Sequence, residues 1–304
     1  MGDRLLVLLW HNVEGTWCYP SSPGAGREGF ARQLRRLKQL ATVVPLEDAL
    51  EALADRQRLP PRPVALTFDD GYRDNLDVAV PILEDLGLPA TFFLVPGLLS
   101  NTVRPWWEVL GRGFALARPA VVHWDGRALP TRGRQGRRAF QWLAERLKVL
   151  DMAGREERVD ELLALLQPEE EGAHDRLFLD WDGARELVRR HFSVGSHSTR
   201  HAILSREPPE EQVRDLITSR RELEAGLGVQ VRLLAYPNGT RTDYDEATIR
   251  AATLAGHTHA LGAHAGINRS STPVYAHPRF VVAPDRHFVD MLIRRIALRF
   301  PSLW

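Results

Sequence analysis

Residues 64–72 read Val-Ala-Leu-Thr-Phe-Asp-Asp-Gly-Tyr, and this stretch says more about the fold than any other part of the chain. The five residues at 64–68 are strand formers, and they predict a buried β-strand. Asp69 and Asp70 follow side by side, where the strand gives way to a turn at Gly71. Parallel strands of α/β proteins present functional residues at their carboxyl ends. The stretch therefore predicts a strand that delivers two carboxylates to a site.

A second motif, His197-Ser-Thr-Arg-His201, lies far downstream and follows another strand-like segment. Histidines four residues apart can share one face of a helical turn. One carboxylate and two imidazoles are three protein ligands, the number that a catalytic divalent metal uses while it keeps a position for water. Alone, Asp69-Asp70 before a glycine is also typical of a turn that closes a strand. The histidine pair alone is also typical of a polar helix face or of a buried, hydrogen-bonded pair. Together the motifs favour a metal-dependent hydrolase whose second carboxylate is a base.

With these motifs the chain resembles the polysaccharide deacetylase family of carbohydrate esterases, which includes chitin and peptidoglycan deacetylases. The similarity extends to Leu-Leu-Trp-His-Asn-Val at 8–13, to Ala-Tyr-Pro-Asn-Gly at 235–239 and to Tyr-Ala-His-Pro-Arg-Phe at 275–280. It is weak between about 101 and 175. The resemblance implies a distorted (β/α)7 barrel and a metal-dependent N-deacetylase.

The resemblance also implies a role for each motif residue. Asp70, His197 and His201 would bind a divalent metal, and Asp69 would be the general base. Zinc is the first choice for two imidazoles and one carboxylate, and Co²⁺, Ni²⁺ or Mn²⁺ are the alternatives. Two neighbours are expected either to hold the ligands by hydrogen bonds or to be merely structural: Thr67 and Ser198.

The segment at 235–239 departs from the usual Arg-x-Pro-aromatic pattern of the family and matches a subset of relatives. The backbone N–H of Asn238 falls at the position that contributes to the oxyanion hole. Ala235 replaces the arginine that would orient the base. Arg279 is the best substitute, with a structural ion pair as the alternative. The tryptophan-bearing fourth motif of the family is not evident.

The proton donor has no clean motif in this sequence. His277 is the first candidate and His264 the second, followed by His257 and His259, and each of them can instead be structural. Strand alternation predicts that His277 and Arg279 face the same side. Further residues are expected to contact substrate, with a packing role as the alternative for the tryptophans: His11, Trp106, Trp107 and Tyr236.

Composition limits the other classes of function. At 304 residues, 44% of them hydrophobic, the chain suits a single α/β domain. The net charge of +1 and the lack of a nucleic-acid motif or a phosphate-binding glycine loop argue against a nucleic-acid partner. The apolar run at 5–10 is too short for a signal peptide, no stretch could span a membrane, and the single Cys18 cannot form an internal disulfide. We therefore expect a cytoplasmic protein.

Strands and helices alternate along most of the chain. Strands are expected over 4–10, 42–44, 64–68, 89–95, 192–195, 231–236, 258–262 and 274–282. Helices are expected over 28–40, 46–55, 75–86, 208–225 and 243–255, and from about 285. This alternation predicts parallel βα units that close into a barrel.

Residues 97–178 break the alternation, and we interpret them as an insertion within a single domain that spans 1–304. A hairpin near 121–129 and a long charged helical pattern at 134–166 are expected there. The insertion is placed over the barrel mouth, either as a lid that selects substrate or as helices that only pack on the barrel. The basic amphipathic stretch at 291–300 predicts a last helix packed on the barrel, with an anionic membrane surface as the alternative.

The sequence thus predicts hydrolysis of the N-acetyl group of an amino sugar or its conjugate, in one step, with release of acetate. A cytoplasmic location favours a small or carrier-linked sugar over a wall polymer. The alternatives are another amide hydrolase on the same scaffold, such as a deformylase or a cyclic-amide hydrolase, and a carbohydrate-binding relative without catalysis. Asp69 argues against the last, because a binding protein has no use for a spare carboxylate beside a metal.

Overall fold

A curved parallel sheet forms the centre of the protein in the computed structural model, which describes residues 4–20, 25–169 and 177–282. Segment 277–281 completes the circle, because His277 forms a parallel bridge to Leu261 at the end of β9 (His259–Leu261), while β11 (Phe280–Val281) pairs in parallel with β1 (Arg4–Trp10). The result is the distorted (β/α)7 barrel that the sequence predicts. Its strands follow in the order β1 (Arg4–Trp10), β3 (Pro63–Phe68), β4 (Thr91–Leu94), β7 (Ser193–Ser196), β8 (Leu233–Ala235), β9 (His259–Leu261) and β11 (Phe280–Val281).

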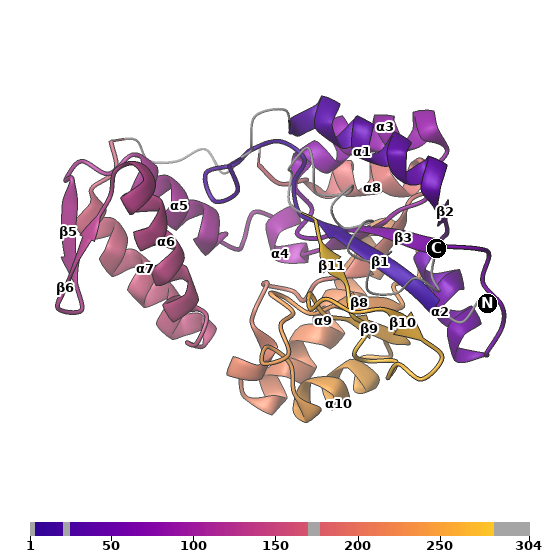
Figure 1. Ribbon diagram of the computed structural model, residues 1–304. Helices are drawn as coiled ribbons and strands as arrows, with labels where there is room; N and C mark the ends of the chain where they lie inside the picture. Colours follow the sequence, from indigo (N-terminus) through magenta and orange to yellow (C-terminus); the bar gives the residue numbers. More distant parts are fainter. Residues whose placement is uncertain (1–3, 21–24, 170–176, 283–304) are drawn as a thin grey trace.

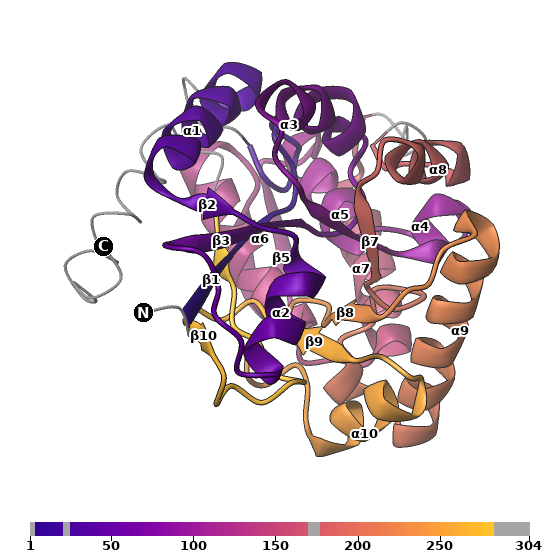
Figure 2. The ribbon, with the colours of Figure 1, turned by 90° about the vertical axis from the view of Figure 1, so that its right-hand side faces the viewer.

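The central strands are apolar on both faces because helices cover their outer side. All six residues of β3 are buried. Amphipathic helix α1 (Gly26–Leu40) buries Phe30, Leu34 and Leu37 against β1 and β3. The remaining helices around the barrel are α3 (Val80–Leu86), which continues from a wide π turn at Asn75–Ala79, α8 (Trp181–Arg189), α9 (Pro209–Leu227) and α10 (Glu246–Leu254); Figure 2 shows them surrounding the strands.

The two ends of the barrel are covered differently. Helix α2 (Leu46–Ala54) lies across the end where β1 begins, and its leucines pack on the inward residues of β1 and β8. The insertion lies beyond the other end, toward which the parallel strands run (Figure 1). It consists of α5 (Trp106–Ala115), the hairpin β5 (Val121–Trp124) and β6 (Arg127–Pro130), α6 (Gly133–Leu147) and α7 (Met152–Leu166). The insertion has a hydrophobic core of its own.

Several predicted elements need correction. The helical pattern at 134–166 is two helices, because Asp151 caps α7 by accepting a hydrogen bond from Gly154. The strand expected over 274–282 is reduced to the bridge at His277 and to β11. The structure adds short elements that the sequence did not predict: β10 (Asn268–Arg269), α4 (Pro96–Leu99) and a 3₁₀ turn at Leu204–Arg206; β2 is confined to Thr42–Val43.

The helix predicted from about 285 and the basic stretch at 291–300 lie outside the described residues. Among the helices that the structure does describe, none combines the length and the apolar character needed to cross a membrane.

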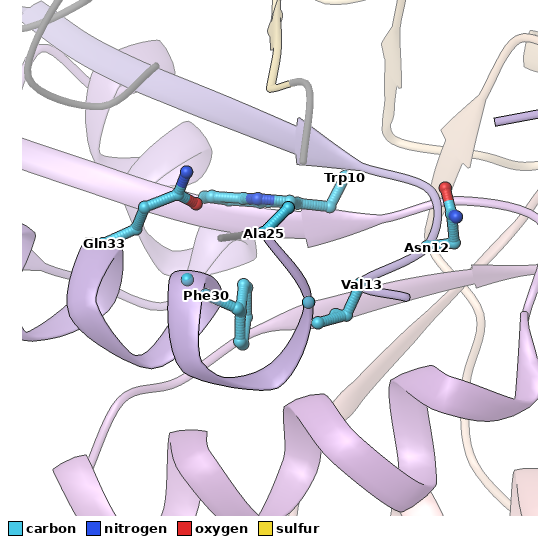
Figure 3. A pocket seen from close by; sticks show the side chains of 8 residues that line it. Trp10, Asn12, Val13, Ala25, Phe30 and Gln33 are labelled. Carbon is cyan, nitrogen blue, oxygen red and sulfur yellow. The ribbon is translucent and has the colours of Figure 1, made fainter. Parts of the chain in front are cut away.

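A small pocket lies between the end of β1 and the start of α1 (Figure 3). Its wall includes Trp10, Phe30 and Gln33. Trp10 and Phe30 belong to the core between the sheet and α1, on the outer side of the barrel. None of the residues that line this pocket carries the predicted chemistry, so we treat it as a packing gap and not as the site.

Candidate metal centre

The structure brings Asp70, His197 and His201 together at the carboxyl ends of β3 and β7. One carboxylate oxygen of Asp70 lies 3.3 Å from Nε2 of His197 and 3.2 Å from Nε2 of His201. The three possible ligand atoms all lie within 4.8 Å of one another, and the Asp70 and His197 side chains are almost fully buried. Two residues that are 127 and 131 positions downstream of Asp70 therefore converge on it through the fold.

The loops that carry this group have an unusual backbone. Asp70 (φ 71°), Ser198 (φ 62°), His201 (φ 55°) and Asn238 (φ 59°) all occupy the left-handed region that residues other than glycine rarely adopt. The prediction that the two histidines share a helical turn is therefore wrong. Residues 197–201 form a loop, and Ser198 and His201 within it have a left-handed backbone. Gly71 (φ 74°) completes the tight turn after Asp70, and a side chain there would meet Leu94.

Each histidine presents Nε2 to Asp70. His197 uses Nδ1 for a 2.7 Å hydrogen bond with the backbone carbonyl of Ala235, which fixes its tautomer and leaves Nε2 without a proton in the neutral form. His201 packs against the ring of Trp107, with centroids 4.4 Å apart. Oδ1 of Asp70 is buried and accepts no hydrogen bond from the described residues. A buried carboxylate oxygen facing two bare imidazole nitrogens fits a divalent metal such as zinc.

The electrostatics of the group also suit a cation. Burial would raise the pKa of the Asp70 carboxyl, but His201 and His197 beside it outweigh burial and hold that pKa well below its ordinary value. Burial likewise lowers the pKa of the His197 imidazole, yet Asp69 and Asp70 outweigh it and raise the pKa. For His201 burial prevails over Asp70, and its pKa is lowered. The group thus stabilises a negative Asp70 next to positive charge.

Asp69 is held by an arginine from the far end of the sequence. Both oxygens of Asp69 accept 2.8 Å hydrogen bonds from the two terminal nitrogens of Arg279, and neither side chain is more than 3% exposed. Nε of Arg279 donates to the carbonyl of Gly262, and a terminal nitrogen donates to Oγ1 of Thr67. The structure therefore places Arg279 where the sequence, with Ala235 at the usual arginine position, predicted a cation. A bidentate pair of this kind fixes the plane of the carboxylate.

His11 also lies at this end of the barrel. It directly follows β1, whose Trp10 pairs with the last residue of β3, and the backbone N–H of Asp69 donates to the carbonyl of Trp10. This register puts His11 at the level of Asp69. His11 is a minor contributor to the lowered pKa of Asp70, and its ring stacks on Tyr19 with centroids 5.5 Å apart. His11 is half-buried.

His277, the first candidate for the proton donor, has a different environment. Its Nδ1 bonds to Asn268 and its Nε2 to His259, and the side chain is 2% exposed. Burial and, to a smaller extent, the neighbouring His259 lower the pKa of His277 to about 3. Both ring nitrogens are occupied, so the geometry gives His277 no free proton to donate. This geometry favours the structural alternative for His277, a hydrogen-bonding role.

His264 and Asn238 lie in the loops after β9 and β8. Nδ1 of His264 is buried without a partner among the described residues, and burial together with the charge of Arg241 lowers the pKa of this imidazole. The Asn238 side chain donates to Asp243, which anchors the left-handed turn. None of the described residues accepts a hydrogen bond from the backbone N–H of Asn238, as an oxyanion-hole donor requires.

The sequence profile of the Polysaccharide deacetylase family matches residues 56–260, which contain every residue of the Asp70–His197–His201 group. The chain belongs to the polysaccharide deacetylase family. The Bacillus subtilis protein YxkH, which is named for this family, is 19% identical over 283 residues, covering 92% of this chain and 72% of YxkH. Family membership places the chain among hydrolases that remove acetyl groups from acetylated polysaccharides.

Solved structures of deacetylases share the fold. The Streptococcus pyogenes deacetylase PplD, solved with acetate, superposes with a TM-score of 0.65 at 16% identity, covering 97% of this chain and 98% of PplD. The BpsB deacetylase domain of Bordetella bronchiseptica gives 0.61 at 18% identity over 94% and 97%. IcaB from Ammonifex degensii gives 0.59 at 22% identity over 93% and 94%. At these identities the likeness shows the polysaccharide deacetylase fold and no more.

Three aromatic residues that the sequence assigned to substrate have packing roles in this deacetylase fold. Trp106 and Trp107 are 9% and 6% exposed and belong to the core of the insertion, and Trp107 covers His201 while its Nε1 donates to the hydroxyl of Tyr72. The Tyr236 ring is buried and stacks on a neighbouring tyrosine. These contacts favour packing over a substrate role for all three residues.

Sequence reasoning missed a buried carboxylate beside the site. Glu108 on α5 is 1% exposed and accepts hydrogen bonds from the hydroxyl of Thr16 (2.7 Å), the hydroxyl of Tyr72 (2.9 Å) and the backbone N–H of Cys18 (3.2 Å). Burial raises the pKa of Glu108, and these three donors oppose the shift. The insertion is thereby tied to the loop after β1. No local pattern marks Glu108; only its apolar neighbours on both sides hint that it is buried.

Proposed function

We propose that this chain hydrolyses the N-acetyl group of an amino sugar, free or within a saccharide, with a divalent metal held by Asp70, His197 and His201. Zinc is the first choice for this donor set. The observation that carries the proposal is the bidentate Asp69–Arg279 pair next to the three ligands, since a spare, oriented carboxylate serves a reaction and not the binding of a metal. When bound, the metal supplies Lewis-acid chemistry: it acidifies water and polarises a carbonyl group.

The protein groups perform the remaining steps. Asp69, with its plane fixed by Arg279, takes a proton from the attacking water. The tetrahedral oxyanion that follows needs donors, and the free backbone N–H of Asn238, held in its turn by the bond to Asp243, supplies one. The reaction is one-step hydrolysis with no covalent intermediate on the protein.

The departing amine must be protonated as the C–N bond breaks. We assign this step to His11, because the register of β1 on β3 puts it level with Asp69 and because it is only half-buried, whereas both ring nitrogens of His277 are occupied. His264 is the second candidate, since its Nδ1 has no partner. Protonation of the leaving amine completes the release of acetate.

Acetate release tests the proposal. The purified protein, stripped of metal and then reloaded with Zn²⁺, Co²⁺, Ni²⁺ or Mn²⁺, is incubated with N-acetylglucosamine, with its oligomers and with nucleotide-linked N-acetyl sugars. We expect acetate only after metal is restored, and Asp69→Asn protein loaded with the same metal is the matched control. Release of formate from N-formyl sugars, or opening of cyclic amides, without release of acetate would favour the alternative amide hydrolases. Binding of saccharides without any hydrolysis would favour a non-catalytic relative.

A further inference from the structure

The two candidate histidine ligands are held in different ways. His197 bonds through Nδ1 to the carbonyl of Ala235 at 2.7 Å, and its side chain is 1% exposed. The His201 side chain is 13% exposed, and its Nδ1 is buried without a hydrogen-bond partner among the described residues. A histidine that binds a metal almost always donates its other ring N–H to an acceptor, and that bond sets the direction of the ring. His201 therefore needs another means of orientation.

Trp107 packs on the ring of His201 from outside the candidate metal centre. The two ring centroids lie 4.4 Å apart, and the rings are tilted by 46°. Trp107 comes from α5, which lies on the barrel side of the insertion (Figure 1), and it is 6% exposed. In a close-packed interior, an indole ring that cannot turn limits the positions open to the imidazole packed against it. The orientation of His201 thus depends on what holds Trp107.

Two hydrogen bonds in series hold the indole. Nε1 of Trp107 donates to the hydroxyl of Tyr72 at 2.8 Å, and that hydroxyl donates to the Glu108 carboxylate at 2.9 Å. The direction of both bonds is fixed, because an indole N–H can only donate and an ionised carboxylate can only accept. Glu108 also accepts from the hydroxyl of Thr16 and from the backbone N–H of Cys18. The side chains of Trp107, Tyr72 and Glu108 are all buried.

Tyr72 connects this series to the other side of the metal centre. It follows the candidate ligand Asp70 by two residues, after the tight turn at Gly71. Its backbone forms an antiparallel bridge with Phe178, and the ring centroids of Tyr72 and Phe178 lie 4.6 Å apart. The Phe178 ring also packs edge-on against Trp107, with centroids 6.2 Å apart. Tyr72 and Trp107 therefore join the turn that carries Asp70 to the ring of His201.

We propose that Trp107 and Tyr72 are positioning residues for the metal centre, and that they orient His201 by ring packing where His197 is oriented by a hydrogen bond. The inference rests on the proposed function and extends it to the insertion, because α5 supports the centre without supplying a ligand. Without Trp107, the His201 ring would keep its contacts with Asp70 and His197, which are members of the centre themselves. Partners that orient metal ligands typically contribute about 10–100-fold to metal affinity.

Zinc affinity tests the proposal with matched pairs of variants. Tyr72→Phe removes the hydroxyl that accepts from Trp107, whereas Tyr275→Phe removes a hydroxyl that donates to the carbonyl of His257. Trp107→Leu removes an aromatic ring from the core of the insertion, and Phe140→Leu removes another ring from the same core. The dissociation constant for Zn²⁺ is measured on each metal-free protein by competition with a chelator. Urea unfolding of the same metal-free samples records their stability.

The two positioning variants should differ from their controls. We expect the Zn²⁺ dissociation constant to rise about tenfold in Tyr72→Phe and about 100-fold in Trp107→Leu. In Tyr275→Phe and Phe140→Leu it should stay within about threefold of wild type, even where urea unfolding shows a loss of stability. The visible absorption of the Co²⁺-loaded protein should change in Tyr72→Phe and Trp107→Leu alone, because a turned His201 alters the arrangement of ligands around the metal.

Other outcomes separate this inference from the proposed function. Wild-type zinc affinity in both Tyr72→Phe and Trp107→Leu, or an equal loss in their controls, would overturn the positioning role and leave the function standing. A loss in Trp107→Leu alone would overturn the part assigned to Tyr72. Weaker zinc binding in these two variants only, in a protein that releases acetate from no substrate, would support the positioning role and contradict the function. A wild-type chain that binds no divalent metal would contradict both.

Discussion

Strained single residues surround the proposed metal centre. Asp70, Ser198, His201 and Asn238 each have a left-handed backbone. This conformation costs an L-residue a conformational free energy of roughly 1–2 kcal/mol. Such strain persists only where the surrounding contacts determine the conformation, and it concentrates at functional sites. Here Thr199 anchors the loop at 197–201 through two hydrogen bonds. The Thr199 carbonyl accepts one from the backbone N–H of Gly97, and the Thr199 backbone N–H donates one to the Asp215 carboxylate. These contacts fix the loop that carries both candidate histidine ligands.

The adjacent carboxylates should separate by phenotype. Asp69→Asn keeps all three proposed ligands, so we expect it to retain about one metal per chain and to lose roughly 10²–10⁴-fold in kcat, the usual contribution of a general base. Asp70→Asn removes a ligand and should lose metal on dialysis. Elemental analysis and acetate release measure the two effects. If Asp69→Asn lost the metal while Asp70→Asn kept it, the roles would have to be exchanged.

Arg279 should matter through its geometry as well as its charge. Arg279→Lys keeps a positive charge but cannot form two parallel bonds to Asp69 or reach Gly262 at the same time, so we expect kcat to fall at least about 100-fold with the metal retained. Arg279→Met leaves the Asp69 charge buried and unpaired, and it should lower the free energy of unfolding by about 3–5 kcal/mol. Urea unfolding and kcat are measured together. A fully active but unstable Arg279→Lys enzyme would reduce the pair to a structural ion pair.

The proton donor can be identified by the leaving group. An amine must be protonated to depart, whereas 4-nitrophenolate leaves without help. We expect His11→Ala to lose at least about 100-fold on the N-acetylated saccharide and to stay within a few-fold of wild type on 4-nitrophenyl acetate. His264→Ala is the matched comparison and should change both activities alike. The same amide-selective loss in His264→Ala instead of His11→Ala would transfer the role to His264.

At the scale of elements, α5 connects the insertion to the barrel. Trp107 packs on His201, and the adjacent Glu108 joins Tyr72 of the Asp-Asp-Gly-Tyr motif to the turn at Thr16. Consecutive residues of one helix thus contact both sides of the proposed site. Whether the insertion also closes over substrate as a lid stays a prediction.

Replacing Glu108 should loosen the turn after β1. In Glu108→Gln one side-chain oxygen becomes an amide donor that faces another donor, so at least one buried hydrogen bond is lost, at a cost of about 1–3 kcal/mol. We expect faster hydrogen exchange at the backbone N–H of Cys18 and a lower melting temperature. Glu145→Gln, an exposed change on α6, is the control and should stay within about 0.5 kcal/mol. Unchanged exchange at Cys18 would show that the turn does not depend on Glu108.

At the scale of the whole molecule, stability should depend on the buried histidines. His257 is 2% exposed, neither ring nitrogen has a partner among the described residues, and burial, assisted by Arg220, lowers its pKa to about 4. Its ordinary pKa is about 6.5, so between pH 6.5 and 4 the unfolded chain binds a proton that the folded chain does not. The contribution of His257 to stability is therefore complete above pH 6.5 and is lost as the pH falls.

The effect can be isolated by difference. By pH 5 the wild-type protein should lose about 2 kcal/mol relative to His257→Leu, compared with pH 7.5. Asp74 and Asp215, whose pKa values burial raises to about 6, act in the opposite direction but are present in both proteins and cancel. Urea unfolding from pH 7.5 to 5 measures the difference, with exposed His123→Leu as the control. Parallel stability curves for wild type and His257→Leu would contradict a buried neutral His257.

Local sequence determined the features that depend on neighbours in the chain. The apolar run at 64–68 specified a buried strand, its last residue placed Asp69 and Asp70 at the carboxyl end, and the alternation of strands with helices predicted the barrel. The His-x-x-x-His spacing predicted that both imidazoles lie next to Asp70, but with the wrong local structure. Spacing indicates which side chains can reach one another and not which backbone conformation they adopt. A left-handed turn of non-glycine residues has no reliable signature in sequence.

Only the tertiary structure decided which distant residues meet. Arg279 reaches Asp69 across 210 positions because segment 277–281 closes the barrel beside β1. His277 precedes Arg279 by two residues on that segment, and two extended residues span roughly 7 Å. His277 therefore lies away from Asp69 along the segment, although strand alternation predicted the same side for both residues. His11 lies level with Asp69 through the register of β1 on β3. Register and chain closure arise from packing across the whole sheet, whereas periodicity in a single segment records only which face is buried.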